Sequence, residues 1–241
     1  MPAPKTIPPE LYDDFTLNGQ IPVDYTTHFD DEHGPDNPLY WNKEQTDYYL
    51  QIARAKNCTT YAEDKFLYQG LDKYRKRIAY KNVAVIGSIR PCYEAILLSY
   101  QAHPITIEYS IIICSDSRLK VYTVKEFEQN PRTFDALLSV SSLEHDGLGR
   151  YGDPIDPNAD LKFMEKAKKL IPKDGLFFLQ VPVAKDRLNF NGNRIYGKLR
   201  LPMLLKGWKI LETYGFSEEM LETEGGTQPL FVLTPEDGFV L

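Results

Sequence analysis

Residues that could take part in acid–base chemistry gather in the segment Ser141–Asp160. The adjacent pair Glu144 and His145 follows directly behind the apolar run "FDALLSV". Imidazole has an ordinary pKa of about 6.5, so His145 is the better candidate for a general base that takes a proton from a hydroxyl, with Glu144 as the runner-up. In an extended loop neighbouring side chains point to opposite sides, so the two are not expected to reach one atom. The alternative is that His145 is a hydrogen-bonded structural residue.

Two further groups of polar side chains are candidates for binding a substrate. Arg150 and Tyr151 stand between glycines, as side chains displayed by a shaped loop do. The second group follows the next apolar run and consists of Asn191, Asn193, Arg194 and Tyr196. Arginine, amide and phenol groups suit anionic, phosphorylated or sugar-like ligands. An ordinary long connection is the other interpretation of the second group.

Four aspartates in the same segment raise the question of a metal ion: Asp146, Asp153, Asp156 and Asp160. The run "DPIDPNAD" also has the pattern of two Asx–Pro turns followed by the N-terminus of a helix near residue 161. The turns are the favoured interpretation, and no metal site is predicted. A transferase or hydrolase that uses a metal at these aspartates is kept as a rival hypothesis.

The elements that must position these residues alternate between strands and helices from Asn82 onward. Apolar runs predict strands at 82–87, 104–109, 119–124, 134–140, 176–183, 207–216 and 228–235. Between them, "PCYEAILLSYQA" predicts an amphipathic helix and "DLKFMEKAKKLI" a second helix. Such alternation predicts a doubly wound, mostly parallel seven-stranded α/β sheet.

The chain before this sheet lacks the alternation of strands and helices. We assign residues 1–80 to an N-terminal arm and helical cap, and residues 81–241 to the α/β domain. Residues 1–40 are rich in proline and show little periodicity, which predicts an extended arm. Helical periodicity follows from about residue 44 to residue 77, with Thr59 or Thr60 as the expected N-cap of its second helix and Glu63 behind it.

The carboxyl ends of the strands predict where a ligand binds, because doubly wound sheets bind ligands there. The first strand ends in Gly87, and Glu108 ends the second strand 21 residues later, where an acidic side chain can accept the hydroxyls of a ribose. Only the first glycine of a GxGxxG pattern is present, so a tight turn is the other interpretation of Gly87. The predicted nucleoside-binding residues are Gly87, Ser88, Glu108, Tyr109, Ser141 and Ser142.

Charge and composition narrow the class of partner. The net charge of −6 and the single short basic run argue against a protein that binds nucleic acid by neutralising phosphates, so small molecules are the expected partners. The three cysteines lack the spacing of a disulfide framework or a zinc site. No signal peptide and no run of about 18 apolar residues is present, so a cytoplasmic location is expected. The sequence does not indicate an oligomeric state.

Four stretches together resemble one known family: "VIGSIRPCYEAILL", "TIEY", "SSLEHDGLGRYGDPIDPNADL" and "FNGNRIYGKLRLPML". They are similar to the DUF268 family, a domain related to class I S-adenosylmethionine-dependent methyltransferases, over roughly residues 45–215. The resemblance implies a Rossmann-like methyltransferase fold, S-adenosylmethionine as cofactor and S-adenosylhomocysteine as product. Its bacterial members look like partners of surface-glycan synthesis, which points to sugar-containing substrates.

The leading hypothesis is therefore O-methylation of a carbohydrate or another small hydroxylated acceptor. Catalysis itself is uncertain at this point, since a fold does not establish an activity. The alternative is a non-catalytic module of the same fold that binds a nucleoside, a sugar nucleotide or a protein partner. The incomplete glycine pattern favours the alternative, and the dense polar loop after the fourth strand favours the enzyme.

Overall fold

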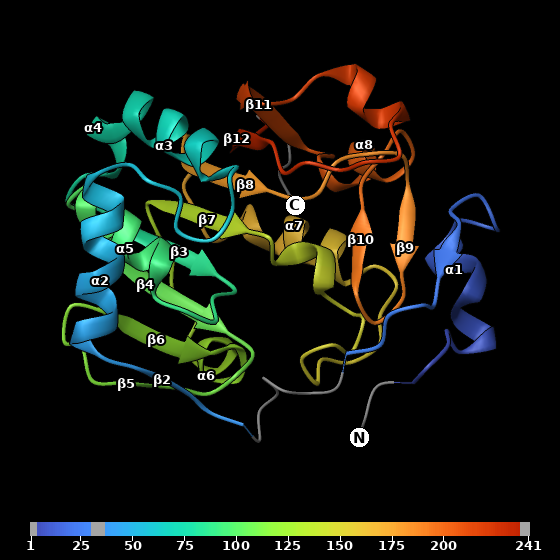
Figure 1. The fold of residues 1–241 in the computed structure, drawn as a ribbon, viewed down its shortest axis with the longest axis horizontal. Coiled ribbons are helices and arrows are strands. Elements are labelled where there is room, and N and C mark those ends of the chain that lie inside the picture. The colour runs from blue at the N-terminus through green and yellow to red at the C-terminus, as the bar shows by residue number, and fades with distance from the viewer. Residues whose placement is uncertain (1–3, 30–36, 237–241) are drawn as a thin grey trace.

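A computed structural model describes residues 4–29 and 37–236 and is organised around one seven-stranded sheet (Figure 1). Its strands, in spatial order, are β11 (Trp208–Tyr214), β12 (Leu230–Pro235), β8 (Leu176–Gln180), β7 (Ala136–Val140), β3 (Asn82–Ile86), β4 (His103–Glu108) and β6 (Lys120–Thr123). The five strands from β8 to β6 are parallel, whereas β12 is antiparallel to both β8 and β11. The predicted doubly wound, mostly parallel seven-stranded sheet of the class I methyltransferase type is confirmed.

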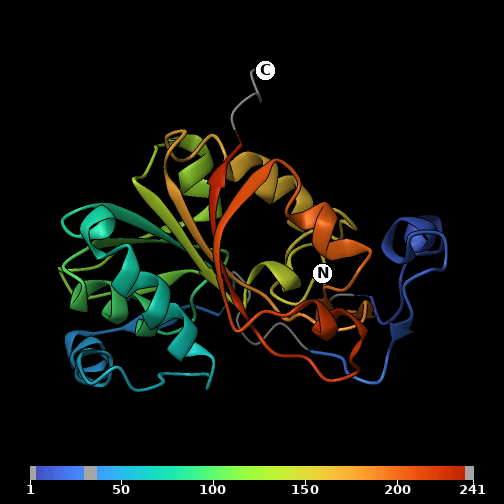
Figure 2. The same cartoon turned by 90° about the horizontal axis from the view of Figure 1, so that it is seen from above.

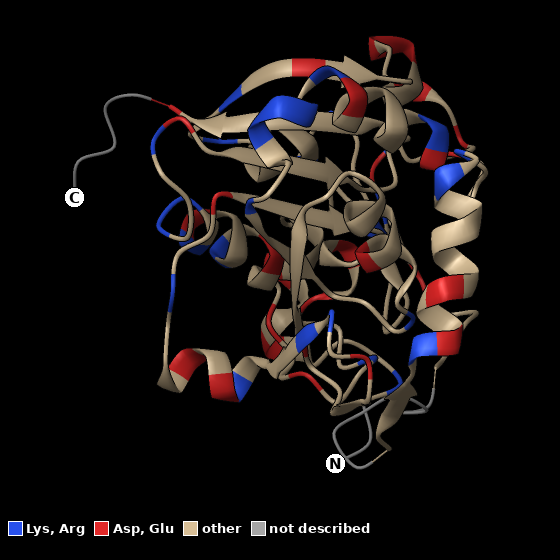
Figure 3. Cartoon of the chain, turned by 90° about the vertical axis from the view of Figure 1, so that its left-hand side faces the viewer, with Lys and Arg blue, Asp and Glu red and all other residues tan. Residues whose placement is uncertain are grey.

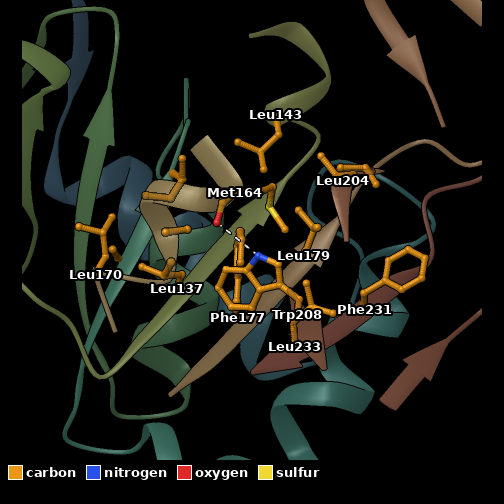
Figure 4. Close-up of a cluster of buried hydrophobic side chains, with 14 of the residues drawn as sticks. Leu137, Leu143, Met164, Leu170, Phe177, Leu179, Leu204, Trp208, Phe231 and Leu233 are labelled. Carbon is orange, nitrogen blue, oxygen red and sulfur yellow. Dashed lines mark hydrogen bonds between the residues drawn. The ribbon is translucent and has the colours of Figure 1, made fainter. Parts of the chain in front are cut away.

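Helices cover both faces of this sheet (Figure 2). One face is covered by α3 (Asp64–Lys73), α4 (Arg75–Ile78) and α5 (Cys92–Ser99), and α2 (Lys43–Arg54) packs on the outer side of α5. The other packs against α6 (Val124–Gln129), α7 (Ala159–Ala167) and α8 (Arg200–Leu204). Within the second core, Trp208 packs on Phe177 and donates its indole N–H to the carbonyl of Met164 at 3.3 Å (Figure 4). Strands buried on both faces explain why β3, β7 and β8 are almost entirely apolar.

Helix α5 differs from the amphipathic helix that the sequence predicts. Residues 92–97 are all buried, because the sheet covers one side of α5 and α2 covers the other. The predicted amphipathic pattern is therefore wrong for this helix. A helix between two layers has no wet face and needs no polar stripe.

The start of α3 also differs from its prediction. The helix begins at Asp64, after Glu63, and neither Thr59 nor Thr60 caps it. Both threonines instead donate to Asp64, whose Oδ2 accepts the backbone N–H of each at 2.6 and 3.0 Å and the Thr59 hydroxyl at 2.8 Å. The predicted N-cap is wrong because the buried carboxylate of Asp64 orders the preceding turn.

The N-terminal segment is more structured than an extended arm. It contains η1 (Pro9–Leu11), α1 (Tyr12–Thr16), β1 (Val23–Asp24) and β2 (Leu39–Trp41); its residues 1–3 and 30–36 lie outside the described part of the chain. Strand β1 runs parallel to β9 (Arg187–Asn189), which forms a hairpin with β10 (Asn193–Ile195), and β2 pairs with β5 (Ile112–Cys114). A small separate core, which includes Ile7, Phe15, Leu188 and Phe190, fixes the arm against this hairpin. The arm thereby reaches the loop that follows β7.

No helix within residues 4–29 and 37–236 is both long and apolar enough to cross a lipid bilayer.

Candidate functional site

A cavity of about 810 Å³ opens at the carboxyl ends of β3, β4 and β7. Eleven of the fourteen residues predicted from the sequence line it: Gly87, Ser88, Glu108, Tyr109, Ser141, Ser142, Glu144, His145, Arg150, Tyr151 and Asn193. Asn191, Arg194 and Tyr196 do not line it. The sheet brings the loops after three strands to one place because parallel neighbouring strands end at the same edge.

The turn after β3 depends on a glycine. Gly87 has a φ of +73°, a conformation that favours glycine, and its N–H donates to the carbonyl of Ile107 on β4 at 3.0 Å. A Cβ atom at this position would lie 1.9 Å from the Ser142 hydroxyl oxygen. Gly87 therefore allows the loops after β3 and β7 to touch.

Glu108 holds that turn at the end of β4. Its Oε2 accepts the backbone N–H of Ser88 at 2.6 Å, and its Oε1 accepts those of Tyr109 and Ser110 at 2.7 and 3.1 Å. Burial raises the pKa of the Glu108 carboxyl, and the three N–H groups oppose that rise. A carboxylate has about four acceptor positions, so one remains on Oε2 for a ligand hydroxyl.

Glu94 supports the same turn from behind and was missed by the sequence analysis. It is fully buried on α5, and its Oε1 accepts the Thr106 hydroxyl at 2.7 Å. Its Oε2 lies 3.2 Å from the Ser88 hydroxyl, which also lies 2.9 Å from the carbonyl of Arg90. A hydroxyl has one proton, so both contacts are satisfied together only when Glu94 is a neutral acid. Burial raises the pKa of Glu94 to about 7. Its signal in the sequence is an acidic residue inside the otherwise apolar run "CYEAILL".

The pair Glu144 and His145 is not arranged as the sequence predicts. Both residues belong to a short 3-10 helix, η2 (Leu143–His145), and not to an extended loop. His145 Nε2 lies 3.8 Å from Glu144 Oε1, and both side chains line the cavity. The expectation that they point to opposite sides is wrong, because a 3-10 helix turns consecutive side chains by about 120° and not by 180°.

The structure fixes the protonation pattern of His145. Its Nδ1 lies 2.6 Å from the carbonyl oxygen of Gly192, which can only accept, so Nδ1 carries the proton and Nε2 has the free lone pair. Burial, followed by the nearby charge of Arg150, lowers the pKa of His145 to about 4. The ring is therefore neutral at pH 7. Gly192 belongs to the loop between β9 and β10, so the backbone of this loop orients the His145 ring.

Glu144 is tied to two other elements. Its Oε1 accepts the Ser141 hydroxyl at 2.8 Å, and the Ser141 oxygen in turn accepts from Gln228 Nε2 at 3.2 Å. Glu144 Oε2 is buried and has no hydrogen-bond partner among the described residues. Burial raises the pKa of Glu144 to about 7. Gln228 also lines the cavity, although it lies far away in the sequence, just before β12, and nothing in its local pattern marks it.

Arg150 lines the cavity but is held by its neighbours. Its guanidinium carbon lies 3.9 Å from the centre of the Phe29 ring and 5.2 Å from that of Tyr151. One of its N–H groups also reaches the carbonyl of Gly192 at 3.5 Å. Phe29 comes from the N-terminal arm, so the arm helps to shape the cavity wall.

Three predicted substrate-binding residues lie in the scaffold around the cavity. Arg194 is buried and donates to the carbonyls of Asp146, Asp156 and Pro157. The buried Tyr196 hydroxyl donates to Asp160 at 3.0 Å. The buried Asn191 accepts the N–H of Phe29 through Oδ1 at 2.5 Å. They order the loop after β7 and the N-terminal arm, and their polar groups do not face the cavity.

The aspartate-rich run forms turns, as its pattern indicates. Asp156 Oδ1 accepts the N–H of Asn158 at 3.0 Å, and α7 follows from Ala159. Asp153 accepts the N–H groups of Gly149 and Tyr151 at 3.1 and 3.2 Å. Within the described part of the chain, no group of three or more His, Cys, Asp or Glu is arranged to hold a metal ion.

The chain matches one protein family and is similar to several solved structures. The profile of the family described as "Caenorhabditis protein of unknown function, DUF268" matches residues 80–226. No curated protein sequence matches the chain. Among solved structures, the chain is similar to 1,6-didemethyltoxoflavin-N1-methyltransferase of Burkholderia thailandensis, whose crystal structure holds 1,6-didemethyltoxoflavin and S-adenosylhomocysteine (15% identity, 79% of this chain and 90% of that chain, TM-score 0.49). It is also similar to a cyclopropane synthase of Mycobacterium tuberculosis (12% identity, 80% and 94% covered, TM-score 0.47) and to the CcbJ methyltransferase of Streptomyces caelestis (11% identity, 79% and 98% covered, TM-score 0.47).

Proposed function

The chain belongs to the DUF268 family, and we propose that it is an S-adenosylmethionine-dependent methyltransferase that O-methylates a carbohydrate or another small hydroxylated acceptor. One observation carries the proposal: the Gly87 turn, the Glu108 carboxylate and the neutral His145 ring line the same cavity. Its volume of about 810 Å³ lies within the usual range for small-molecule and cofactor sites. S-adenosylhomocysteine would be the product.

The residues present fit the cofactor. Gly87 and Ser88 would lie at its methionine end, and Glu108 would accept a ribose hydroxyl at its remaining acceptor position. The other predicted cofactor-binding residues that line the cavity are Tyr109, Ser141 and Ser142. When bound, S-adenosylmethionine supplies an electrophilic methyl group. The protein contributes the position of the acceptor and the removal of one proton.

In this proposal, side chains of the loop after β7 bind the acceptor and take its proton. The free lone pair of His145 Nε2 would take the proton of the acceptor hydroxyl, while Gly192 holds the opposite side of the ring. Glu144 is the second candidate for this base. Its pKa of about 7 is closer to neutral pH than the pKa of His145, about 4, so the ordinary imidazole pKa no longer favours His145, and the case for His145 is its free, oriented Nε2. The side chains that line the cavity beside them, Arg150, Tyr151 and Asn193, would bind the acceptor. Arg194, Tyr196 and Asn191 would act only by keeping the loop and arm in place.

Replacing Glu108 with alanine is expected to weaken the binding of S-adenosylhomocysteine by about 10- to 100-fold, the value of a lost hydrogen bond to a charged group. Isothermal titration of the purified wild type and variant measures this. Because the substitution also releases the N–H of Ser88, the same pair is titrated with adenosine and 2′,3′-dideoxyadenosine. A ribose contact predicts that only adenosine loses affinity in the variant, and equal losses would remove the ribose assignment.

Replacing His145 with asparagine is expected to lower turnover by about 10²- to 10⁴-fold with cofactor affinity retained. The amide can still donate to Gly192, as Nδ1 does, but it has nothing at the position of Nε2. The readout is the formation of S-adenosylhomocysteine with a set of sugar acceptors, and Glu144→Gln is measured beside it. Normal turnover in His145→Asn with a loss in Glu144→Gln would transfer the role of base to Glu144.

The second candidate function is a non-catalytic module that binds a nucleoside, a sugar nucleotide or a protein partner. One observation favours it: Gly87 is the only glycine of the GxGxxG pattern in "VIGSIRPCYEA", as expected of a degenerate cofactor site. Binding of sugar nucleotides, with no binding of S-adenosylmethionine or S-adenosylhomocysteine, would support this candidate over the enzyme.

A further inference from the structure

Some acidic side chains around the cavity form ion pairs with lysine, and others do not. At its rim, Asp156 pairs with Lys162 at 2.6 Å and Glu128 with Lys166 at 2.9 Å. The other acidic side chains of the lining are Glu108, Glu144, Asp146 and Asp153, and within the described residues none of them forms an ion pair with Lys or Arg. Along the ribbon seen in Figure 3, acidic and basic positions are interspersed. Acidic side chains without a Lys or Arg ion pair are thus gathered at the cavity.

Three of these acids, Glu144, Asp146 and Asp153, lie on the loop after β7 and are called the acidic wall here. In the described structure, the carboxyl of Asp146 accepts no hydrogen bond, although it lines the cavity. Independently, Glu144 is only 1% exposed and its Oε2 has no partner. Burial and the neighbouring carboxylates raise the pKa of Asp146 well above its ordinary value. Within the described residues, the Asp146 carboxyl and the Oε2 atom of Glu144 therefore have no hydrogen-bond donor, whereas Ser141 donates to Glu144 Oε1 and two backbone N–H groups donate to Asp153.

The charges of Arg150 and Arg194 oppose the rise in the pKa of Glu144, and that of Arg194 opposes the rise in the pKa of Asp146, but within the described residues neither arginine forms an ion pair with the wall. The Arg150 guanidinium stacks on Phe29 and reaches the carbonyl of Gly192. Arg194 donates to backbone carbonyls and lies 3.8 Å from Asp160. Burying a carboxylate without a partner costs free energy. An anionic ligand at the wall would add electrostatic repulsion to that cost, whereas a cationic ligand would offset it.

We propose that the acidic wall, Glu144, Asp146 and Asp153, binds a protonated amine of the acceptor. The proposal rests on the proposed function and makes its acceptor a hydroxylated molecule that carries an amino group, as an amino sugar does. A protonated amine has no lone pair to attack a methyl group, so it is the group that is recognised and a hydroxyl is the group that is methylated. Such a ligand supplies N–H donors and a positive charge to Asp146 and to Glu144 Oε2, which have no partner within the described residues.

The test compares three sugars on protein saturated with S-adenosylhomocysteine: glucosamine, N-acetylglucosamine, in which the amine is neutral, and glucose 6-phosphate. Isothermal titration is expected to show glucosamine binding at least about tenfold more tightly than the other two. Binding is also expected to release protons near pH 7, because an ammonium favours the charged carboxylates of Glu144 and Asp146. Titration in two buffers of different ionisation enthalpy measures that release.

The variant Asp146→Asn keeps the shape of the side chain and removes its charge, and it is expected to reduce the preference for glucosamine about tenfold. Glu128→Gln is the matched control, since it removes the same charge from the same cavity at a carboxylate already paired with Lys166. Equal affinities for the three sugars, a preference for the phosphate, no binding of glucosamine, or the same result for both variants would overturn the proposal.

S-adenosylhomocysteine also carries an ammonium group, which could itself occupy the acidic wall. Titrating the sugars into protein already saturated with S-adenosylhomocysteine separates binding of the acceptor amine from binding of the cofactor amine. If glucosamine binds only in the absence of S-adenosylhomocysteine, the wall serves the cofactor and the acceptor assignment is wrong. If S-adenosylhomocysteine itself does not bind, the proposed function fails, and titration of the free protein with the same sugars still decides whether the wall selects an amine.

Discussion

Replacing Asp160 with alanine is expected to lower the free energy of unfolding by about 3–5 kcal/mol, a large part of the total stability of a domain. Asp160 is fully buried and accepts from Arg200 at 2.6 and 3.1 Å and from Tyr196 at 3.0 Å. Burial alone would raise the pKa of Asp160, but Arg194 and Arg200 outweigh it and hold that pKa below its ordinary value. The substitution would leave two buried guanidinium groups without their carboxylate.

Urea unfolding and thermal denaturation measure this loss, and Asp156→Ala is the matched control. Asp156 stands four residues earlier and pairs with Lys162, whose side chain is 69% exposed, so its replacement is expected to cost about 1 kcal/mol or less. If the two variants lose similar stability, the buried cluster around Asp160 is not what holds the loop after β7 to α8.

Replacing Gly87 with alanine is expected to weaken the binding of S-adenosylhomocysteine by about 10- to 100-fold. The added Cβ would lie 1.9 Å from the Ser142 oxygen and 2.7 Å from the Ser142 Cβ, and it would occupy a φ of +73°. The loop after β3 must then move, which separates the N–H of Ser88 from Glu108. Isothermal titration measures the affinity, with thermal denaturation beside it.

Two comparisons identify the cause of that effect. Gly19 has a similar φ of +79° and nothing within 4 Å of an added Cβ, so Gly19→Ala measures the cost of the backbone conformation alone. Adding Ser142→Gly to Gly87→Ala removes both close contacts and is expected to restore most of the affinity. A double variant that binds as weakly as the single one would show that the collision with Ser142 is not the cause.

The regular elements of this protein could be predicted because their signals are local. Runs such as "NVAVI" and "LFFLQ" are buried on both faces, and only a strand inside a sheet needs that composition. The position of Glu108 could be predicted too, because the length of a strand–helix–strand unit fixes where the second strand ends. The sequence also placed His145, Arg150 and Tyr151 at the cavity, since loops after parallel strands share one edge of the sheet.

The directions of the side chains in these loops were decided by the tertiary structure. Arg194 and Tyr196 have the residue types of a binding site, yet they serve the buried Asp160 and the carbonyls around it. Glu94 is held by Thr106 of the next strand and Gln228 by Ser141, and these partners are close only once the sheet has formed. A period in the sequence reports which face of a helix or strand is buried, but a loop has no period. The sequence by itself therefore determined the sheet and the edge where its loops meet, and only the packing of distant segments determined which polar groups remain free to face a ligand.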